Sequence, residues 1–569
     1  MSPTVACLIA FAIYALAYRF YAGHLSKRVF ALDPDRATPA VELEDGVDYV
    51  PTNRFVLFGH HYASITGLAP MLGPAVAVIW GWVPAMLWVV FGAILIGCVH
   101  DFGALVVSVR AKGMSIGKVA EGIIGPRAKT LFHLIIFFGI GLAMGVFVFV
   151  IAKLFSLELG PGKPGYPQSV LPSGGLMVVA MGMGWLLYRK GWRLLPLTAA
   201  GFVIQLLLVR AGMEWPTLGL DESAWPSAGT WTWILLAYAF AASVLPVWSL
   251  LQPRDFLNSL LLYLGLGATY LGFFVMGPEF AAPAVVAAPE GAPPLFPFVF
   301  IVIACGAASG FHSLVSSGTT AKQLARETDA RFIGYGGMLG ESLLGLLAVL
   351  ACTAGFAGPE LWHGHYGNWA SAAGGLAIKI DAFIGGYTRF LTGIGVPETL
   401  GASFIATVVV SFALTTLDSA TRLLRFNIEE VGETLGLAVA KNRLLTAGLA
   451  VGVIAWFAFY EVGGKPAALA LWTLFGTVNQ ILAGLALLVV TLYLKQRGRS
   501  PWFTGVPMIF MFATTLTAMV RQMIGFAGKG QILLLVIDGL LLAIAIWLII
   551  EAALALRRGD RFESLDIVV

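Results

Sequence analysis

The stretch Gly59-His-His-Tyr-Ala-Ser-Ile-Thr-Gly-Leu-Ala-Pro-Met-Leu-Gly-Pro74 lies inside an apolar segment long enough to cross a membrane. Its last eight residues hold two glycines and two prolines. Proline removes a backbone donor and disfavours helix in the residue before it, so we expect unwinding around Gly67 to Gly73. Backbone groups freed inside a bilayer persist only where they face protein or a water-filled cavity. The stretch therefore predicts an interrupted transmembrane helix beside a binding site, with a kinked packing helix as the alternative.

The composition around this stretch is that of a membrane protein. Of the 569 residues, 58% are hydrophobic and only 12% are charged, and the mean hydropathy is +0.85. Soluble domains carry about 25% charged residues, so this chain has too little polar surface for a water-soluble body. The cysteines Cys7, Cys98, Cys305 and Cys352 all lie in apolar segments without CxxC spacing. We interpret them as buried side chains, neither disulfides nor metal ligands.

The apolar segments predict fifteen transmembrane helices, since a helix needs about 20 apolar residues to cross the hydrocarbon. The segment 371–394 is amphipathic and is expected on the surface or as a re-entrant element. The fifteen expected spans are 3–23, 56–80, 83–108, 129–154, 171–188, 192–210, 230–250, 257–276, 296–317, 334–357, 398–420, 443–460, 467–493, 504–520 and 532–553.

The distribution of basic residues predicts the orientation. With the N-terminus outside and the C-terminus in the cytoplasm, 27 of the 35 lysines and arginines fall on the cytoplasmic side. This matches the positive-inside rule and an odd number of spans. We expect a multi-pass protein of the inner, cytoplasmic membrane with an extra N-terminal helix and linker (1–52), a transport core (53–428) and further C-terminal helices (429–569).

A second interruption is predicted in the seventh span, at Ser243-Val-Leu-Pro246-Val-Trp248. The second and seventh spans each begin a set of five helices, 56–210 and 230–420, and five helices per set invert the second set. The predicted fold class is therefore an all-α polytopic membrane protein with a five-plus-five inverted-repeat core. One extra helix would precede this core and about four would follow it.

Hydroxyl residues are dense at the end of the ninth span. Ser316, Ser317 and Thr319 could supply oxygen ligands to a sodium ion, because hard cations prefer oxygen. The alternative is that these hydroxyls bond locally to helix carbonyls. The small residues before them are also explained by close helix packing.

Several ionisable residues lie near the ends of the expected spans. A charge at the bilayer centre costs about 2.5–3.5 kcal/mol, so their positions call for a structural or functional explanation. Asp418 and Arg422 are four apart on one helix face and are expected to pair. We interpret Arg254, Asp255, Asp418 and Arg422 either as gating pairs or as ion pairs that hold helix ends. The candidates for proton coupling are His60, His61, His312, Asp101 and Glu341.

At these residues the chain resembles the carbon starvation protein A family, in its peptide and pyruvate carrier branch. The matching stretches cover roughly residues 53 to 484 and include GHHYASITGLAPMLGP, GCVHDFGALVVSVRAKGMSIG, LPVWSLLQPRDFLNS, LFPFVFIVIACGAASGFHSLVSSGTTAKQLARETDARFIGYGGMLGES, TTLDSATRLLRFNIEEVG and ALWTLFGTVNQILAG.

The resemblance implies a LeuT-like fold of the amino acid, polyamine and organocation (APC) superfamily. It also implies uptake of pyruvate or short peptides during carbon starvation, with proton coupling. One departure concerns the first interruption, where the family has Gly-Ala-Gly-Pro and this chain has Gly67-Leu68-Ala69-Pro70. The bulkier Leu68 and Ala69 are expected to narrow or reshape the pocket.

The sequence thus predicts a secondary transporter rather than an enzyme, since it has no GxSxG, HExxH or phosphate-loop motif. A small carboxylate would meet backbone amides at the first interruption, with a proton or sodium ion neutralising part of its charge. We expect no cofactor apart from a possible bound sodium ion, and no nucleic-acid partner, since there is no long basic tract. Two alternatives are a membrane redox subunit with histidine-bound haem and an uncoupled channel or sensor. The expected substrate-binding residues are Gly67, Leu68, Ala69, Pro70, Gly73, Ser243, Pro246 and His312.

Overall fold

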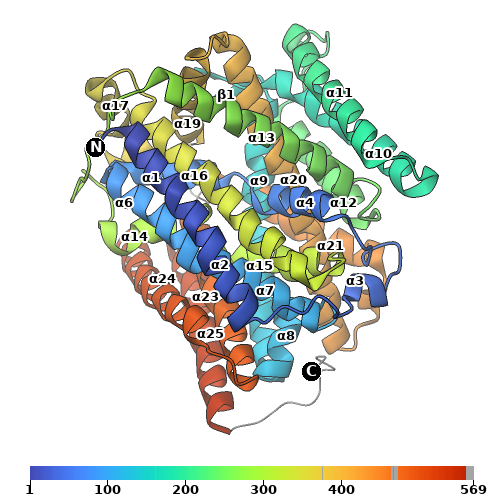
Figure 1. The fold of residues 1–569 in the computed structure, drawn as a ribbon. Coiled ribbons are helices and arrows are strands. Elements are labelled where there is room, and N and C mark those ends of the chain that lie inside the picture. The colour runs from blue at the N-terminus through green and yellow to red at the C-terminus, as the bar shows by residue number, and fades with distance from the viewer. Residues whose placement is uncertain (161, 374–375, 460, 463–464, 467–471, 559–569) are drawn as a thin grey trace.

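The computed structural model describes residues 1–160, 162–373, 376–459, 461–462, 465–466 and 472–558, which form an almost entirely helical body (Figure 1). Eleven described helices are long and apolar enough to cross a membrane, and a bent pair of helices forms a twelfth candidate span. The chain is therefore a multi-pass membrane protein by length and composition of its helices.

The elements in the expected spans are α1 to η2 (Pro3–Val29), α4 (Arg54–Ile65) with α5 (Ala69–Ala77) and η3 (Val78–Trp80), α6 (Trp82–Leu87) with η4 (Trp88–Gly97) and α7 (Cys98–Arg110), α9 (Pro126–Phe155), α10 (Val170–Lys190), α11 (Leu194–Glu214), α12 (Ala228–Val244), α13 (Leu251–Met276), α14 (Leu295–Val302) with α15 (Gly310–Gly318), η9 (Arg331–Tyr335) with α16 (Gly336–Ala354), α20 (Glu398–Thr434), α21 (Arg443–Phe459), α23 (Trp472–Gln496), α24 (Trp502–Gly528) and α25 (Ile532–Arg558). Shorter elements connect them: α3 (Pro39–Glu42), α8 (Ile116–Ile123), η7 (Thr320–Lys322), α17 (Pro359–Tyr366), α18 (Trp369–Ala373), α19 (Leu376–Thr392) and the antiparallel hairpins β1 (Glu158–Gly160) with β2 (Lys163–Pro164) and β3 (Glu461–Val462) with β4 (Lys465–Pro466).

Over its described residues, each of the fifteen expected spans coincides with one helix or with a run of consecutive helical elements. Residues 460 and 467–471 of the twelfth and thirteenth spans lie outside the described residues. The smaller number of long helices has a simple origin. The helices α12 and α21 have only 17 residues each, and the ninth expected span is split into two short helices, α14 and α15.

The first interruption is confirmed, but it is shorter than expected. The helix α4 ends at Ile65, α5 begins at Ala69, and the two axes differ by 48°. Gly73 and Pro74 lie inside α5 rather than in unwound chain, which corrects the predicted length. The reason is the position of Pro70 in the first turn of α5, where a missing backbone donor costs nothing.

The second interruption lies in the ninth expected span, not in the seventh. The helix α14 ends at Val302 and α15 begins at Gly310, with Gly306 at a φ of 87° between them. The segment around Ser243 and Pro246 is instead the connection between α12 and α13, so the predicted break there was wrong. Proline disfavours helical conformation in the residue before it. Pro246 therefore marks the C-terminal end of α12 and does not divide a transmembrane span into two helices.

Burial separates a core from peripheral helices. The hairpin of α10 and α11 lies at one edge (Figure 1), and only 33% and 22% of its two spans is buried, against 94% for the span of α23. The helix α19, within the amphipathic segment expected on the surface or as a re-entrant element, packs against α16 and α20 with Phe383 and Phe390 buried. The segment is therefore not a surface helix.

Candidate functional site

The two interruptions meet inside the protein. A Cβ atom on Gly306 would lie 3.6 Å from the Cβ of Pro70, and one on Gly73 would lie 2.5 Å from the carbonyl oxygen of Val302. Pro70, Gly73 and Gly306 are buried at this crossing, as are Leu68 and Ala69, and Val302 is half-buried. The close approach of the two backbones therefore depends on glycine at these positions.

The first interruption faces two other core helices. A Cβ on Gly67 would lie 2.9 Å from Phe147 of α9 and 3.0 Å from the hydroxyl oxygen of Thr416 of α20. At the start of α5, the backbone N–H groups of Met71 and Leu72 both donate to the carbonyl of Leu68, at 3.2 and 3.0 Å. The positive end of the α5 dipole thus lies in the buried interior, close to α9 and α20.

The N-terminus of α15 is capped by a side chain from α23. The Asn479 Oδ1 atom accepts from the backbone N–H of Phe311 at 2.9 Å, and its Nδ2 donates to the Ser309 hydroxyl at 3.0 Å. The sequence analysis missed this residue, although it lies in a matching stretch, because no local pattern links it to a helix 170 residues away. Asn479 satisfies a donor that the interruption leaves without a helical partner.

Replacing Asn479 with alanine is expected to lower stability and uptake together, because a buried N–H at the interruption loses its acceptor. The expected cost is about 1–3 kcal/mol. The matched control is Asn442→Ala, since Asn442 is exposed and caps α21 through Leu444 and Leu445. That control should cost about 1 kcal/mol and leave uptake unchanged. Thermal unfolding in detergent and uptake by proteoliposomes measure both effects, and equal losses in the two variants would contradict the assigned role.

A buried ion cluster joins α4, α12, α13 and α20, and we call it the Arg254 cluster. The Arg254 Nη2 atom lies 2.5 Å from Asp255 Oδ1, and Nη1 contacts Asp418 and the Tyr238 hydroxyl. His60 Nδ1 lies 2.8 Å from the other Asp255 oxygen. One guanidinium therefore bridges two carboxylates, an arrangement that offsets the cost of burying them.

The expected pair of Asp418 with Arg422 is wrong, because Asp418 turns to Arg254 instead. Arg422 pairs with Asp48 of the linker at 2.9 Å and donates to the carbonyls of Ala242 and Leu245. Burial raises the pKa of Asp48, but Arg422 and other nearby cations outweigh it and hold that pKa below its usual value. Arg422 thus fastens the linker and the end of α12 to α20.

A second cluster joins α7, α15 and α16, and we call it the His312 cluster. Asp101 lies between two histidines, 2.7 Å from His100 Nδ1 and 2.8 Å from His312 Nδ1. The other ring nitrogen of His312 lies 3.3 Å from Glu341 Oε2. All four side chains are fully buried. His61 is not part of this cluster, since its Nδ1 lies 2.9 Å from the Thr320 hydroxyl.

The hydroxyls expected to bind sodium are mostly engaged in local bonds. Ser317 donates to the Ser313 carbonyl at 2.7 Å, and Thr319 donates to the Val315 carbonyl at 3.1 Å. Among the described residues only the Ser316 hydroxyl of this set lacks a partner. The geometry therefore matches the local-bonding alternative for Ser317 and Thr319.

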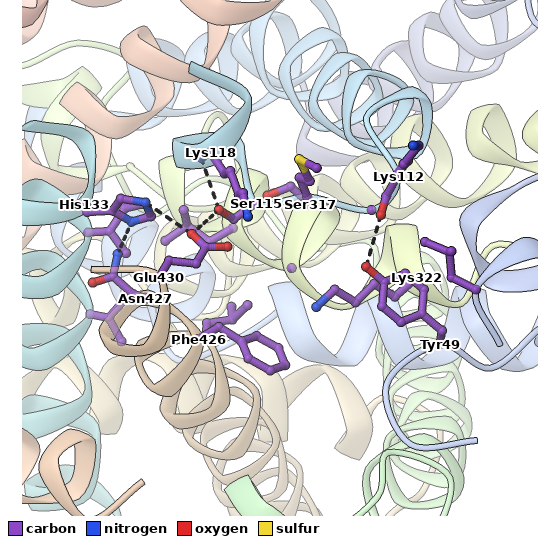
Figure 2. A pocket seen from close by; sticks show the side chains of 18 residues that line it. Tyr49, Lys112, Ser115, Lys118, His133, Ser317, Lys322, Phe426, Asn427 and Glu430 are labelled. Atoms are coloured by element: carbon purple, nitrogen blue, oxygen red, sulfur yellow. Dashed lines mark hydrogen bonds and ion pairs between the residues drawn. The ribbon is translucent and has the colours of Figure 1, made fainter. Parts of the chain in front are cut away.

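A cavity of about 280 Å³ opens between the linker, α8, α9, α15 and α20 (Figure 2). Glu430 accepts from Ser115 at 2.6 Å and lies 3.2 Å from His133. Across the cavity the half-buried Lys322 lies over the rings of Tyr49 and Phe426. Burial lowers the pKa of Lys322, with Asp48 and Glu430 opposing the shift. The cavity thus presents cationic and acidic groups together, which suits a small polar solute.

The cavity ends short of the first interruption. Ile140 of α9 and Leu423 of α20 line it, while Phe147 and Thr416 of the same helices contact Gly67. Each pair is separated by two helical turns, about 10 Å along the helix axis. The two helices therefore run from the cavity toward the interruption.

Comparison of the sequence with known protein families shows which family this chain belongs to. The model of the carbon starvation protein CstA family matches residues 3–358 and 366–518. The chain belongs to the CstA family. It is 33% identical to the "Peptide transporter CstA" of Escherichia coli K12, over 89% of this chain and 79% of that protein.

Other members of the family carry two kinds of name. The "Pyruvate/proton symporter BtsT" of Escherichia coli K12 is also 33% identical, over 89% of this chain and 80% of that protein. The "Peptide transporter CstA" of Bacillus subtilis 168 is 31% identical, over 90% of this chain and 89% of that protein. Among solved structures, a mutant of the Eremococcus coleocola manganese transporter aligns over 91% of this chain and 99% of that chain, with 13% identity and a TM-score of 0.49.

Proposed function

We propose that this protein is a secondary active transporter that takes up pyruvate or short peptides across the cytoplasmic membrane together with protons. The observation that carries the proposal is the meeting of two interrupted helices at Pro70 and Gly306, flanked by two buried charge clusters. Interrupted helices that cross in the interior of a membrane protein are typical of transporter binding sites. The names of the CstA and BtsT relatives support both the class of protein and the class of substrate.

The interruptions support a five-plus-five inverted repeat with a grouping different from the one expected. In this grouping α4–α5 opens the first repeat and α14–α15 opens the second, since these are the two broken spans. The first repeat then continues with α6–α7, α9, α12 and α13, and the second with α16, α20, α21 and α23. The peripheral α10–α11 hairpin is an insertion, and α1, α24 and α25 lie outside the repeats.

The proposed substrate site is the first interruption at the start of α5, beside Phe147 and Thr416. A carboxylate there would meet the positive end of the α5 dipole. From this site the solute leaves along α9 and α20 into the cavity that Lys322 and Glu430 line. Lys112, Lys118 and Lys322 lie in segments expected on the cytoplasmic side, so we assign the cavity to the release pathway.

For proton coupling we propose His60, which hydrogen-bonds Asp255 within the Arg254 cluster. His60 lies on α4, and its hydrogen bond to Asp255 connects it to the ion cluster that holds α13 and α20 together. A change in the charge of His60 would therefore act on that cluster. Protonation of His60 would strengthen its pairing with Asp255 and weaken the hold of Arg254 on that carboxylate. A proton taken up here therefore changes the contacts between the interrupted helix and its neighbours. Sodium at the Ser316, Ser317 and Thr319 hydroxyls is the weaker proposal, because two of the three bond locally.

The remaining alternatives make different demands. A redox subunit would hold haem between histidines on facing helices and would be coloured when purified. The family relatives with transporter names favour a carrier over that reading. An uncoupled channel would pass solute without accumulating it against a gradient.

The test uses purified protein in proteoliposomes with an inward proton gradient or an inward sodium gradient, imposed separately. Labelled pyruvate or a labelled dipeptide should accumulate at least tenfold more with the proton gradient. The His60→Gln variant should lose this accumulation while retaining exchange of labelled for unlabelled solute. The matched control is His24→Gln, since His24 is exposed. Passage without accumulation under either gradient would contradict the carrier, and normal accumulation in His60→Gln would contradict the coupling residue.

A further inference from the structure

We propose that Cys305, His312 and Glu341 bind one divalent transition-metal cation of zinc-like preference at the second interruption. One ligand atom from each residue lies within 4.8 Å of the others, and all three residues are buried. They come from three different places in the fold: Cys305 from the unwound chain, His312 from α15 and Glu341 from α16. This metal site goes beyond the proposed transport function and does not depend on it.

The orientation of His312 is that of a metal ligand. Its Nδ1 atom lies 2.8 Å from Asp101, which leaves Nε2 as the nitrogen that faces Cys305 and Glu341. His100 bonds the other oxygen of Asp101 at 2.7 Å and so fixes that carboxylate in turn. Histidines that bind metals nearly always donate their second N–H to such a carboxylate, which sets the tautomer and the ring direction. His312 Nε2 itself makes no well-aligned hydrogen bond among the described residues.

Glu341 supplies the second and independent observation. Neither of its carboxylate oxygens has a well-aligned hydrogen-bond partner among the described residues, although the side chain is fully buried. The ion pair of Glu341 with His312 Nε2 is long, at 3.3 Å, and burying a carboxylate with so weak a pairing is costly. A cation bound between the two side chains would reduce that cost. His312 cannot do so alone, because it also faces Asp101.

The ligand set matches the chemistry of a borderline-soft cation. A thiolate and a carboxylate together balance two positive charges, and a neutral imidazole adds none. Zinc takes sulfur, nitrogen and oxygen ligands in a tetrahedron whose corners are about 3.5 Å apart. The three ligand atoms lie within 4.8 Å of one another, so metal binding would draw them together by about one ångström. Three protein ligands leave a fourth position for water or another small ligand.

The direct test measures metal in the purified full-length chain. Protein in detergent is loaded with Zn²⁺ or Co²⁺, desalted and measured by mass spectrometry. We expect about one metal per chain, and the cobalt form should show a thiolate-to-cobalt charge-transfer band. The Cys305→Ser and Glu341→Gln variants should hold at least tenfold less metal. Cys352→Ser is the matched control, because Cys352 is equally buried but lies outside the cluster.

The outcomes separate the metal from a simple proton on Glu341. The proposal would be overturned if the wild-type protein, both as purified and after loading, held no stoichiometric metal and its cobalt form showed no cobalt–sulfur band. Glu341 would then be a neutral acid. Equal metal content in Cys305→Ser, Glu341→Gln and Cys352→Ser would also overturn it. Glutamine has nearly the same shape as glutamate, so we expect the Glu341→Gln variant to fold. Its metal content therefore tests the proposal even if the Cys305→Ser variant does not fold. None of these readouts depends on uptake.

Discussion

Replacing Arg254 with glutamine is expected to abolish uptake and to lower the free energy of unfolding by about 3–5 kcal/mol. The guanidinium is the group that bridges Asp255 and Asp418, and all three side chains are buried. Without it, two carboxylates remain in a low-dielectric interior, beside His60, Tyr238 and the Ser64 hydroxyl but without a guanidinium between them. Denaturation in mixed detergents and uptake by proteoliposomes measure the two losses.

The control for this prediction is Arg210→Gln. Arg210 also pairs with a carboxylate, Glu214, but its side chain is 64% exposed. Exposed pairs contribute about 0–1 kcal/mol, so this variant should behave as the wild type. A second variant, Arg254→Gln with Asp418→Asn, should recover part of the stability because it removes one of the stranded charges. An Arg254→Gln protein with wild-type stability would show that the cluster does not hold α13 to α20.

Adding one methyl group at Gly73 is expected to stop transport. A Cβ at this position would lie 2.5 Å from the Val302 carbonyl oxygen and 3.4 Å from the Ile303 Cα atom, so backbone must move. Overpacking of this kind costs about 1–3 kcal/mol. The larger effect falls on function, because the methyl pushes apart the two interrupted helices where they cross. Uptake at equal amounts of folded protein is the measurement.

Gly182→Ala provides the matched comparison. Gly182 lies within the α10 helix, and a Cβ there meets nothing within 4 Å. Alanine in a helix interior is favoured over glycine by about 0.5–1 kcal/mol, so this variant should be at least as stable as the wild type and fully active. Normal uptake in Gly73→Ala would mean that the crossing tolerates separation and is not the transport site.

The sequence predicted the helices well because membrane insertion is a local matter of apolar length. It also predicted the interruption near Pro70, since proline and glycine act on their own stretch of backbone. It misplaced the second interruption because a proline within an apolar segment predicts a break, whereas Pro246 lies just beyond the end of α12, and glycines in the ninth span are equally explained by helix packing. The positive φ that marks Gly306 is invisible in sequence.

The charge pairs show the limit of local rules more clearly. Spacing pairs Asp418 with Arg422 on one helix face, but the partner chosen in the fold is Arg254, 164 residues away. For the same reason the sequence predicted that Cys305 is a buried side chain that binds no metal, and that His312 and Glu341 are proton-coupling candidates. Cys305, His312 and Glu341 have no recognisable spacing, and only the unwound chain before α15 brings the cysteine to the other two. Pairing between residues far apart in the chain depends on how the helices pack, and helix packing cannot be deduced from the local pattern of a single sequence.

The cap that Asn479 places on α15 limits how this protein can move. A helix whose first turn is held by a side chain of α23 cannot swing or tilt alone without breaking two buried hydrogen bonds. During a transport cycle α15 and α23 should therefore move together as a rigid unit, while α5, whose N-terminus has no side-chain cap among the described residues, shifts against them. A covalent tether between α15 and α23 would then be harmless, whereas one between α5 and α14 would freeze the carrier in a single state.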